Sequence, residues 1–213
     1  KLASMREYAI TLWNQRVERP GNDLISMLVN SRIDGELMTR EQYLGTFVLL
    51  VAAGNETTRN SIAGGFLALA EHPQQKHRLL DDSSLMNSAA SEIVRWVSPV
   101  MHMRRTALEP AEIGGQSVQP GDKIILWYCS ANRDESVFDE PFRFDVGRAE
   151  PPHLGFGAGQ HFCLGARLAE TQIRTFYEEF LNRYPNARPE GPVRRIRSNF
   201  IVGYKSIPTR LNG

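Results

Sequence analysis

A mainly α-helical fold with a small β region is predicted by two features of the sequence. Apolar residues recur at helical spacing through most of the first hundred residues and again in residues 164–184. Between these stretches, short apolar runs are separated by pairs such as Gly114-Gly115 and Pro120-Gly121, which are typical of tight turns between strands. An apolar content of 41% and a charged content of 23% are ordinary for a globular chain, so extensive disorder is not expected.

The charge balance and the cysteine count exclude several classes of protein. With 25 Lys and Arg against 24 Asp and Glu, the net charge of +1 is too small for a protein that mainly coats nucleic acid or anionic membrane. The longest apolar stretch, residues 44–54, is shorter than the roughly 20 residues that cross a bilayer, so no membrane anchor is expected. Two cysteines are too few for a disulfide scaffold, which favours a reduced, cytoplasmic location.

Helix-start signals divide the first part of the chain. Asn22 or Asp23 is the expected N-cap of a short helix over residues 24–29. Thr39 and Gln42 have the spacing of a capping box, which predicts a long helix from there to about residue 70.

The long helix is apolar on every side from Val48 to Ala53, which predicts that this part is buried. Pro73 marks the start of a further helix. Another helix is expected over residues 88–97, ending before Pro99.

The second half of the chain carries the β region and one long helix. Its irregular segment is nearly thirty residues long, and loops of this length are uncommon unless they have a function. The expected elements are strands over residues 111–113, 116–118 and 123–128, an irregular segment over 131–159, a helix over 164–184, and short strands near 200–202 and 207.

The most informative segment runs from Gly155 to Gly165. Glycines at 155, 157 and 159 allow backbone conformations that are closed to other residues. Cys163 stands where the long helix is expected to begin, and a helix N-terminus favours the thiolate, the form that binds metal. Taken alone, Cys163 fits a small buried residue at a loop–helix junction equally well.

The whole segment resolves this choice, because the pattern Phe-Gly-x-Gly-x-His-x-Cys-x-Gly is met by Phe156, Gly157, Gly159, His161, Cys163 and Gly165. It resembles the heme-binding loop of the cytochrome P450 family, whose members are heme-thiolate monooxygenases. The resemblance implies that Cys163 is the metal ligand, bound to the iron of heme b (iron protoporphyrin IX). It also implies that His161 bonds a heme propionate, that Phe156 packs near the sulfur, and that Gly165 belongs to the same site.

A second motif lies inside the long helix, in Ala53-Gly54-Asn55-Glu56-Thr57. Polar groups in a buried helix are costly unless they are hydrogen-bonded. From the residues alone, the alternative is a helix interrupted at Gly54, with Thr57 bonding back to a carbonyl. The segment resembles a motif of the same family in which the helix opens beside the heme, Thr57 holds dioxygen and a water, Glu56 relays protons, and Ala53 borders the substrate.

Glu92 and Arg95 lie three residues apart, which is about one turn of a helix. A surface ion pair worth less than about 1 kcal/mol is the ordinary interpretation of such a pair. The pair also matches the Glu-x-x-Arg motif of the cytochrome P450 family, which implies a buried structural network. By the same resemblance, the third member of this network is Arg143.

Arg104 and Arg105 precede the expected hairpin. Tandem arginines are usually solvated. In related soluble proteins, however, the arginine of an Arg-x-Ala pattern binds a heme propionate, to which the guanidinium fork is suited. The spacing to Ala107 favours Arg105, with Arg104 as the alternative. Val100 and Met103 match positions that border substrate in this family, and their apolar side chains indicate a lipophilic substrate.

The resemblance runs through residues 1–213 but corresponds only to the C-terminal part of a single cytochrome P450 domain of the soluble bacterial type. The chain begins at Lys1 just before an expected helix over residues 6–17, so we expect the N-terminal part of the domain to be absent.

The implied activity inserts one oxygen atom of O2 into a C–H bond of a lipophilic molecule such as a sterol, fatty acid or terpenoid. Electrons would come from a ferredoxin-type donor, and Arg167 and Arg174 could meet its acidic surface. Two alternatives remain: a heme-binding or heme-free fragment without catalysis, and a peroxygenase of the same fold. The Glu56–Thr57 pair argues against the peroxygenase.

Overall fold

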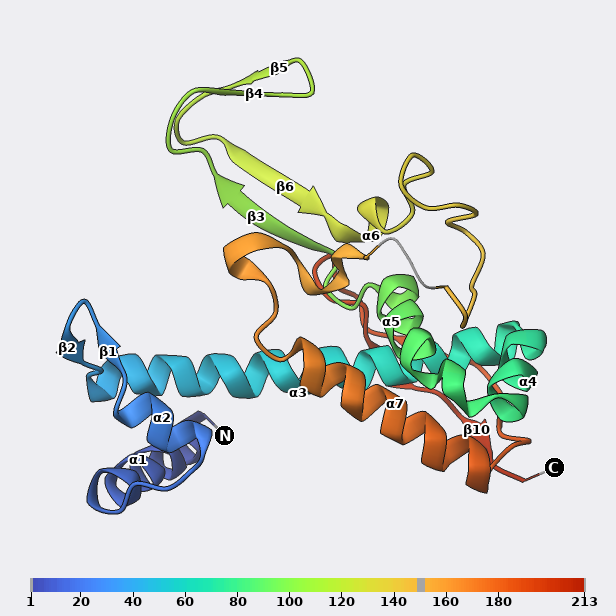
Figure 1. Cartoon of the computed structure of the whole chain (residues 1–213), viewed down its shortest axis with the longest axis horizontal. Helices are drawn as coiled ribbons and strands as arrows, with labels where there is room; N and C mark the ends of the chain where they lie inside the picture. The colour runs from blue at the N-terminus through green and yellow to red at the C-terminus, as the bar shows by residue number, and fades with distance from the viewer. Residues whose placement is uncertain (1, 149–151, 213) are drawn as a thin grey trace. The chain divides into compact units, whose positions relative to one another are not determined.

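The computed structural model describes residues 2–148 and 152–212 of the chain. It is mainly helical with small sheets, as predicted (Figure 1), and forms two compact units, one up to Asn55 and one from Glu56 onward. The helices are α1 (Leu2–Glu18), α2 (Leu24–Val29), α3 (Arg40–Glu71), α4 (Pro73–Asp81), α5 (Met86–Val97), α6 (Tyr128–Ala131) and α7 (Ala166–Arg183), with 3-10 turns η1 (Ser83–Leu85), η2 (Leu154–Phe156) and η3 (Gly159–His161). Among the described residues, no helix has the length and apolar content needed to cross a membrane.

The strands form small antiparallel pairs. β3 and β6 make the longest pair, with Arg104 opposite Ile125 and Arg105 opposite Ile124. The pairs are β1 (Arg32–Ile33) with β2 (Glu36–Leu37), β3 (His102–Thr106) with β6 (Lys123–Trp127), β4 (Ala111–Ile113) with β5 (Gln116–Val118), β7 (Arg188–Pro189) with β10 (Thr209–Arg210), and β8 (Arg194–Arg195) with β9 (Tyr204–Ser206).

Two helix starts in the first unit follow directly from local sequence. The Asp23 carboxylate accepts a hydrogen bond from the Ser26 N–H at 2.8 Å, so Asp23 and not Asn22 caps α2. At the start of α3, the Thr39 N–H donates to Gln42 Oε1 at 2.8 Å and the Gln42 N–H donates to Thr39 Oγ1 at 3.2 Å. This reciprocal pair is the predicted capping box, and it satisfies N–H groups that the helix itself leaves unpaired.

The core of the first unit is a small aromatic cluster. Tyr43 is fully buried, and its hydroxyl donates to the Ala9 carbonyl at 3.2 Å. Its ring contacts those of Trp13 and Phe47, with centroids 4.9 and 5.9 Å away. Aromatic burial of this kind holds α1 against the beginning of α3.

One prediction about α3 is wrong. The stretch from Val48 to Ala53 was expected to be buried on every side, but Val48, Leu49 and Val51 are 38%, 65% and 43% exposed. Apolar side chains on a helix surface favour burial, but burial also requires a second element packed against them. The sequence of the helix itself does not show whether such an element is present.

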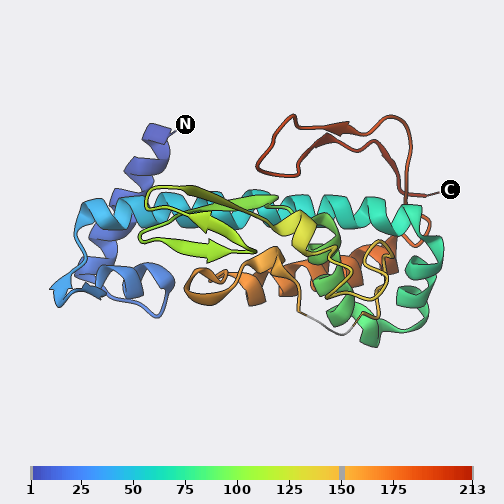
Figure 2. The same cartoon turned by 90° about the horizontal axis from the view of Figure 1, so that it is seen from above.

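The core of the second unit lies between α5, α7 and the last turns of α3. α5 is strongly amphipathic and buries Ile93 and Val94, while α7 buries Ile173 and Tyr177 against them. Figure 2 shows α5 and α7 side by side. The hydroxyl of Tyr177 donates to the Ile62 carbonyl of α3 at 2.6 Å, so a buried polar atom keeps a partner.

Two glycines let these helices approach closely. A Cβ atom at Gly64 would lie 2.6 Å from Val97 Cγ2, and one at Gly65 would lie 2.6 Å from Tyr177 Oη. Contacts this short exclude any side chain, because interiors are packed almost without free space.

The β region and the last helix differ in detail from expectation. The hairpin of β4 and β5 and the strand β6 lie where they were predicted, but β3 was not foreseen as a strand. In α7, Ile173 is fully buried whereas Leu168 is 65% exposed. In the tail, the strands expected near residues 200–202 and 207 are not formed there: Ile201 makes only an isolated bridge to Val100. The tail strands are instead β7, β8, β9 and β10.

Replacing Gly65 by alanine is expected to lower the free energy of unfolding by about 1–3 kcal/mol, because the new methyl group would overpack the contact with Tyr177 and Ile93. Gly45→Ala is the matched control, since Gly45 lies in the same helix with open space around it, and there alanine should stabilise the helix by about 0.5–1 kcal/mol. Urea unfolding measures both. Equal changes of the same sign would contradict the packing explanation.

Candidate functional site

The segment that carries the cysteine motif folds into two consecutive turns ahead of α7. η2 contains Phe156 and η3 contains His161, and Cys163 stands two residues before Gly165, the N-cap of α7. The Cys163 N–H donates to the Phe156 carbonyl at 2.9 Å, which closes the loop on itself. The side chain of Cys163 is exposed and is a free thiol.

Glycine is required at several points of this loop. Gly157 and Gly159 have φ values of 71° and 65°, in the region that side chains rarely adopt. A Cβ at Gly155 would lie 2.7 Å from Val94 Cγ1, so the loop touches α5 with bare backbone. The glycines predicted from the motif therefore serve both the turns and the close approach to α5.

The loop offers one sulfur donor. Among the described residues, no group of three or more His, Cys, Asp and Glu side chains could hold a bare metal ion. A single thiol suits the heme implied by the motif, because the iron of a heme already has four porphyrin nitrogens and takes its remaining ligands from the protein. His161 is exposed beside Cys163, and its imidazole is available to an anionic group. The donor set therefore fits a heme better than a free metal ion.

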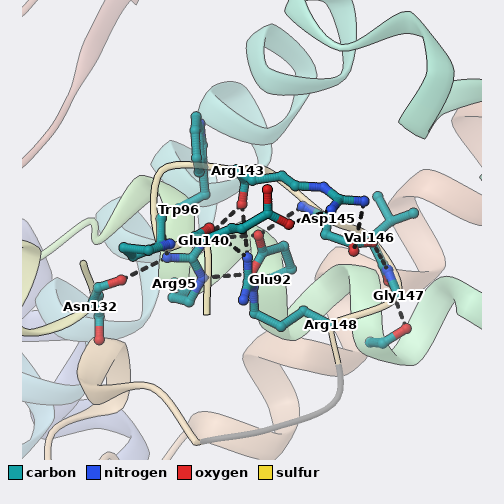
Figure 3. A network of polar contacts seen from close by, with 12 residues as sticks. Glu92, Arg95, Trp96, Asn132, Glu140, Arg143, Asp145, Val146, Gly147 and Arg148 are labelled. Carbon is teal, nitrogen blue, oxygen red and sulfur yellow. Dashed lines mark hydrogen bonds and ion pairs between the residues drawn. The ribbon is translucent and has the colours of Figure 1, made fainter. Parts of the chain in front are cut away.

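Glu92 and Arg95 form a buried, bidentate ion pair. Arg95 Nε lies 2.6 Å from Glu92 Oε2 and Arg95 Nη2 lies 2.8 Å from Glu92 Oε1. Their side chains are 0% and 1% exposed, so the interpretation as a surface pair does not hold. The remaining Arg95 hydrogen bonds go to the carbonyls of Asn132, Pro141 and Arg143 (Figure 3).

The third arginine of this network differs from the one expected. The Arg143 guanidinium bonds Glu140 at 2.5 Å, lies 3.7 Å from Asp145 Oδ2 and is 52% exposed, so the backbone carbonyl of Arg143, and not its guanidinium, contacts the buried pair. Arg148 takes the expected place: its side chain is 12% exposed, and its Nε lies 3.2 Å from Glu92 Oε2, at ion-pair distance but outside hydrogen-bond geometry. Figure 3 shows Arg148 beside Glu92.

Arg148 also braces the irregular segment. Its Nη1 donates to the Asp139 carbonyl at 2.8 Å and its Nη2 to the carbonyls of Glu140 and Arg143 at 3.1 and 3.0 Å. A guanidinium can satisfy several carbonyls at once because it has five donors. No sequence periodicity distinguishes Arg148 from Arg143, since neither lies in a regular element.

His153 caps the turn at the start of the loop. Its Nδ1 accepts from the Gly155 N–H at 2.9 Å, which requires the neutral ring. Burial, with a smaller effect from the charge of Arg95, lowers the pKa of His153 from 6.5 to about 4. This role could not be predicted from the sequence, because a capping histidine has no characteristic spacing.

The motif in α3 lies in regular helix. α3 continues without a break through Gly54, so neither a helix interrupted at Gly54 nor a locally opened one is present. One glycine lowers helix stability by only about 1 kcal/mol, which a helix of this length tolerates. Glu56 is about half exposed and pairs with Arg59 at 2.5 Å, Thr57 is half-buried, and Ala53 is exposed.

The predicted propionate and substrate residues lie on and beside β3. Arg105 is half-buried and its Nη1 donates to the Arg104 carbonyl at 3.1 Å, while Arg104 is exposed. Adjacent strand residues point to opposite faces, so only one of the two can face a given ligand. Val100 is half-buried and bridges to Ile201, and Met103 is 37% exposed on β3.

A comparison with known protein families matches residues 5–211 to the cytochrome P450 model. Among curated relatives, linalool 8-monooxygenase of Pseudomonas putida is 45% identical over 196 residues, which cover 92% of this chain and 48% of that protein. Methyl-branched lipid omega-hydroxylase of Mycobacterium tuberculosis is 46% identical over 208 residues, covering 97% of this chain and 49% of that protein. The chain thus spans about half the length of the curated relatives it matches.

Solved structures show the same fold. A cytochrome P450 of Mycobacterium marinum in complex with pseudoionone matches with a TM-score of 0.92 at 41% identity, over 97% of this chain and 50% of that one. A protein of the same family from Bacillus megaterium in complex with testosterone matches with a TM-score of 0.93 at 33% identity, over 100% of this chain and 59% of that one.

Glu92→Ala is expected to lower the free energy of unfolding by about 3–5 kcal/mol, because it leaves Arg95 buried without its carboxylate, and to prevent heme incorporation. Glu140→Ala is the matched control, since Glu140 and Arg143 have the same spacing but are 59% and 52% exposed, and it should cost less than about 1 kcal/mol. Denaturant unfolding and heme content measure the two effects. A soluble, heme-loaded Glu92→Ala protein would contradict the first expectation.

His153 is expected to make stability depend on pH. The unfolded chain binds a proton at His153 near pH 6.5, whereas the folded chain binds it only near pH 4, so this contribution is complete above about pH 6.5 and is lost as the pH falls to about 4. The loss should reach up to about 3 kcal/mol. In His153→Asn, whose Oδ1 can accept the same Gly155 N–H, this part of the pH dependence should vanish. Parallel stability–pH curves for the two proteins would count against the assignment.

Proposed function

The chain belongs to the cytochrome P450 family, and we propose that the protein it comes from is a heme-thiolate monooxygenase. In this reaction, one atom of O2 enters a C–H bond of the substrate, while two electrons and two protons reduce the other atom to water. The observation that carries the proposal is Cys163, an exposed thiol that ends a glycine-rich loop at the start of α7. Residues 1–213 would form the C-terminal part of one cytochrome P450 domain.

Cys163 would bind the iron of heme b as thiolate. Phe156 would pack near the sulfur, and the backbone at Gly165 would leave room beside it. His161 and Arg105, with Arg104 as the alternative, would hold the propionates through charged hydrogen bonds. The heme supplies the chemistry that activates oxygen, and a thiolate ligand favours cleavage of the O–O bond. The protein residues orient the group and hold it.

Glu56 and Thr57 would handle protons and oxygen. Thr57 would hold dioxygen and a water through its hydroxyl, and Glu56 would pass protons from solvent. The exposure of the Glu56 carboxylate supports this role, because a proton relay must exchange with water at one end.

The substrate would be lipophilic, such as a sterol, a fatty acid or a terpenoid. The apolar side chains of Val100 and Met103, together with Ala53, would border it. Relatives are named for linalool and for methyl-branched lipids, and related structures hold pseudoionone and testosterone, so apolar substrates recur among these proteins.

Electrons would come from a ferredoxin-type donor in the cytoplasm. Arg167 and Arg174, which line a groove of about 580 Å³ between α5 and α7 together with Glu170, would meet the acidic surface of the donor. Opposite charges of this kind accelerate protein association.

Cys163→Ser is expected to abolish the strongly red-shifted Soret band that the reduced protein gives with carbon monoxide, because that band needs a thiolate on the iron. Cys129→Ser is the matched control and should keep it, since Cys129 lies in α6, outside the loop that carries Cys163. An unchanged spectrum in Cys163→Ser would overturn the proposed function.

Product formation then separates the alternatives. Oxygenated product that depends on an electron-donor system supports the monooxygenase. Product formed only with hydrogen peroxide would indicate a peroxygenase, and a heme spectrum without product would indicate a heme-binding protein without catalysis.

A further inference from the structure

A buried amide connects the ion-pair network of Glu92 and Arg95 to Leu154. Leu154 is the first residue of the loop that carries Cys163 (residues 154–163), called the cysteine loop below. Asn132, the C-cap of α6, is completely buried. Its Nδ2 donates to Ser98 Oγ at 2.9 Å and its Oδ1 accepts from the Leu154 N–H at 2.7 Å. Its backbone carbonyl accepts from Arg95 Nη1 at 2.6 Å (Figure 3). One residue therefore contacts α5, the residue after α5, and η2.

The neighbours determine the orientation of this amide. The Leu154 N–H can only donate, so the atom that faces it must be the side-chain oxygen. The nitrogen then faces Ser98 Oγ, whose own proton goes to the Arg95 carbonyl at 2.8 Å. Aspartate would put a charge and a second acceptor in this place, and alanine would leave both neighbours without a partner. Only a neutral amide matches a donor on one side and an acceptor on the other.

The end of α5 gives Asn132 a firm point of attachment. Ser98 has φ 45° and ψ 64°, the left-handed conformation that glycine usually adopts after a helix. It is held there by its N–H, which donates to the Val94 carbonyl at 2.9 Å, and by its hydroxyl bond to Arg95.

From Leu154, backbone hydrogen bonds lead to the cysteine. The Leu154 carbonyl accepts from the Gly157 N–H at 2.9 Å, and the Phe156 carbonyl accepts from the Cys163 N–H at 2.9 Å. A displacement of Leu154 would therefore be passed through η2 to the residue that carries the sulfur.

We propose that Asn132 is a positioning residue for Cys163: its amide fixes the first residue of the cysteine loop on the end of α5, so that the loop presents the sulfur in one place. Only the identity of the group that the Cys163 sulfur binds, the heme iron, rests on the proposed function. The effect on the loop belongs to the protein itself and is measured separately.

A backbone substitution tests the contact without touching Asn132. Leu154→Pro removes the N–H that Asn132 accepts. Proline is tolerated there, because Leu154 is the first residue of η2 and His153 before it is extended, with φ −84° and ψ 161°. Leu154→Ala is the matched control, since it loses the same partly exposed side chain but keeps the N–H. Asn132→Ala removes the amide directly, with the exposed Asn182→Ala of α7 as its control.

Hydrogen exchange measured by mass spectrometry on the purified protein is the first measurement. In Leu154→Pro and Asn132→Ala, residues 155–163 should exchange about tenfold faster than in the respective controls, while segments within α5 and α7 keep their rates. The second measurement is the share of protein that gives the red-shifted Soret band, which should fall in the same two variants.

The two measurements test the positioning role of Asn132 and the proposed function separately. Equal exchange of residues 155–163 in Leu154→Pro and Leu154→Ala, or an acceleration that extends equally to α5 and α7, would overturn the positioning role. If the unsubstituted protein lacks the red-shifted band, the proposed function fails, and the exchange data still decide whether Asn132 holds the loop.

Discussion

The buried pair of Glu92 and Arg95 is the interaction on which the second unit depends. Taking two charges out of water is costly, and the cost is offset only where every remaining donor and acceptor finds a partner. Here Glu92 also accepts from the Asp145 N–H at 2.9 Å, and Arg95 donates to three carbonyls of the irregular segment. The pair therefore holds the irregular segment in place. This segment has few helical or strand hydrogen bonds of its own, and its buried backbone groups need other partners.

The same network reaches the candidate site by way of backbone rather than side chains. Arg148 donates to the carbonyls of Asp139, Glu140 and Arg143. Asn132 accepts from Arg95 through its backbone carbonyl and from the Leu154 N–H through its side chain. Gly155 then lies against Val94 with no room for a side chain. The position of Cys163 is thus a consequence of charge burial in α5, several contacts away, and of glycines that allow close packing.

Local signals predicted the elements whose cause is local. Asp23 caps α2, and Thr39 with Gln42 opens α3, because a cap needs only residues within one turn. The helix expected over residues 88–97, ending before Pro99, is α5 (Met86–Val97). β3 was not predicted because its partner, β6, lies some twenty residues later in the chain. Its own residues, His102–Thr106, also lack the alternation of apolar and polar side chains that indicates a strand. Burial of Val48 to Ala53 was predicted wrongly for a related reason: it depends on a second element that the helix sequence does not contain.

For the site, the sequence by itself determined which chemistry is present: a glycine-rich loop with one thiol, a glutamate and an arginine one turn apart, and tandem arginines before an expected hairpin. Only the tertiary structure decided that Glu92 and Arg95 are buried, that Arg148 rather than Arg143 brings a guanidinium to them, and that Asn132 and His153 hold the loop. The physical reason is that residue type and spacing specify short-range bonds. Which distant carbonyl or amide a side chain meets depends on how the irregular segment folds back on α5.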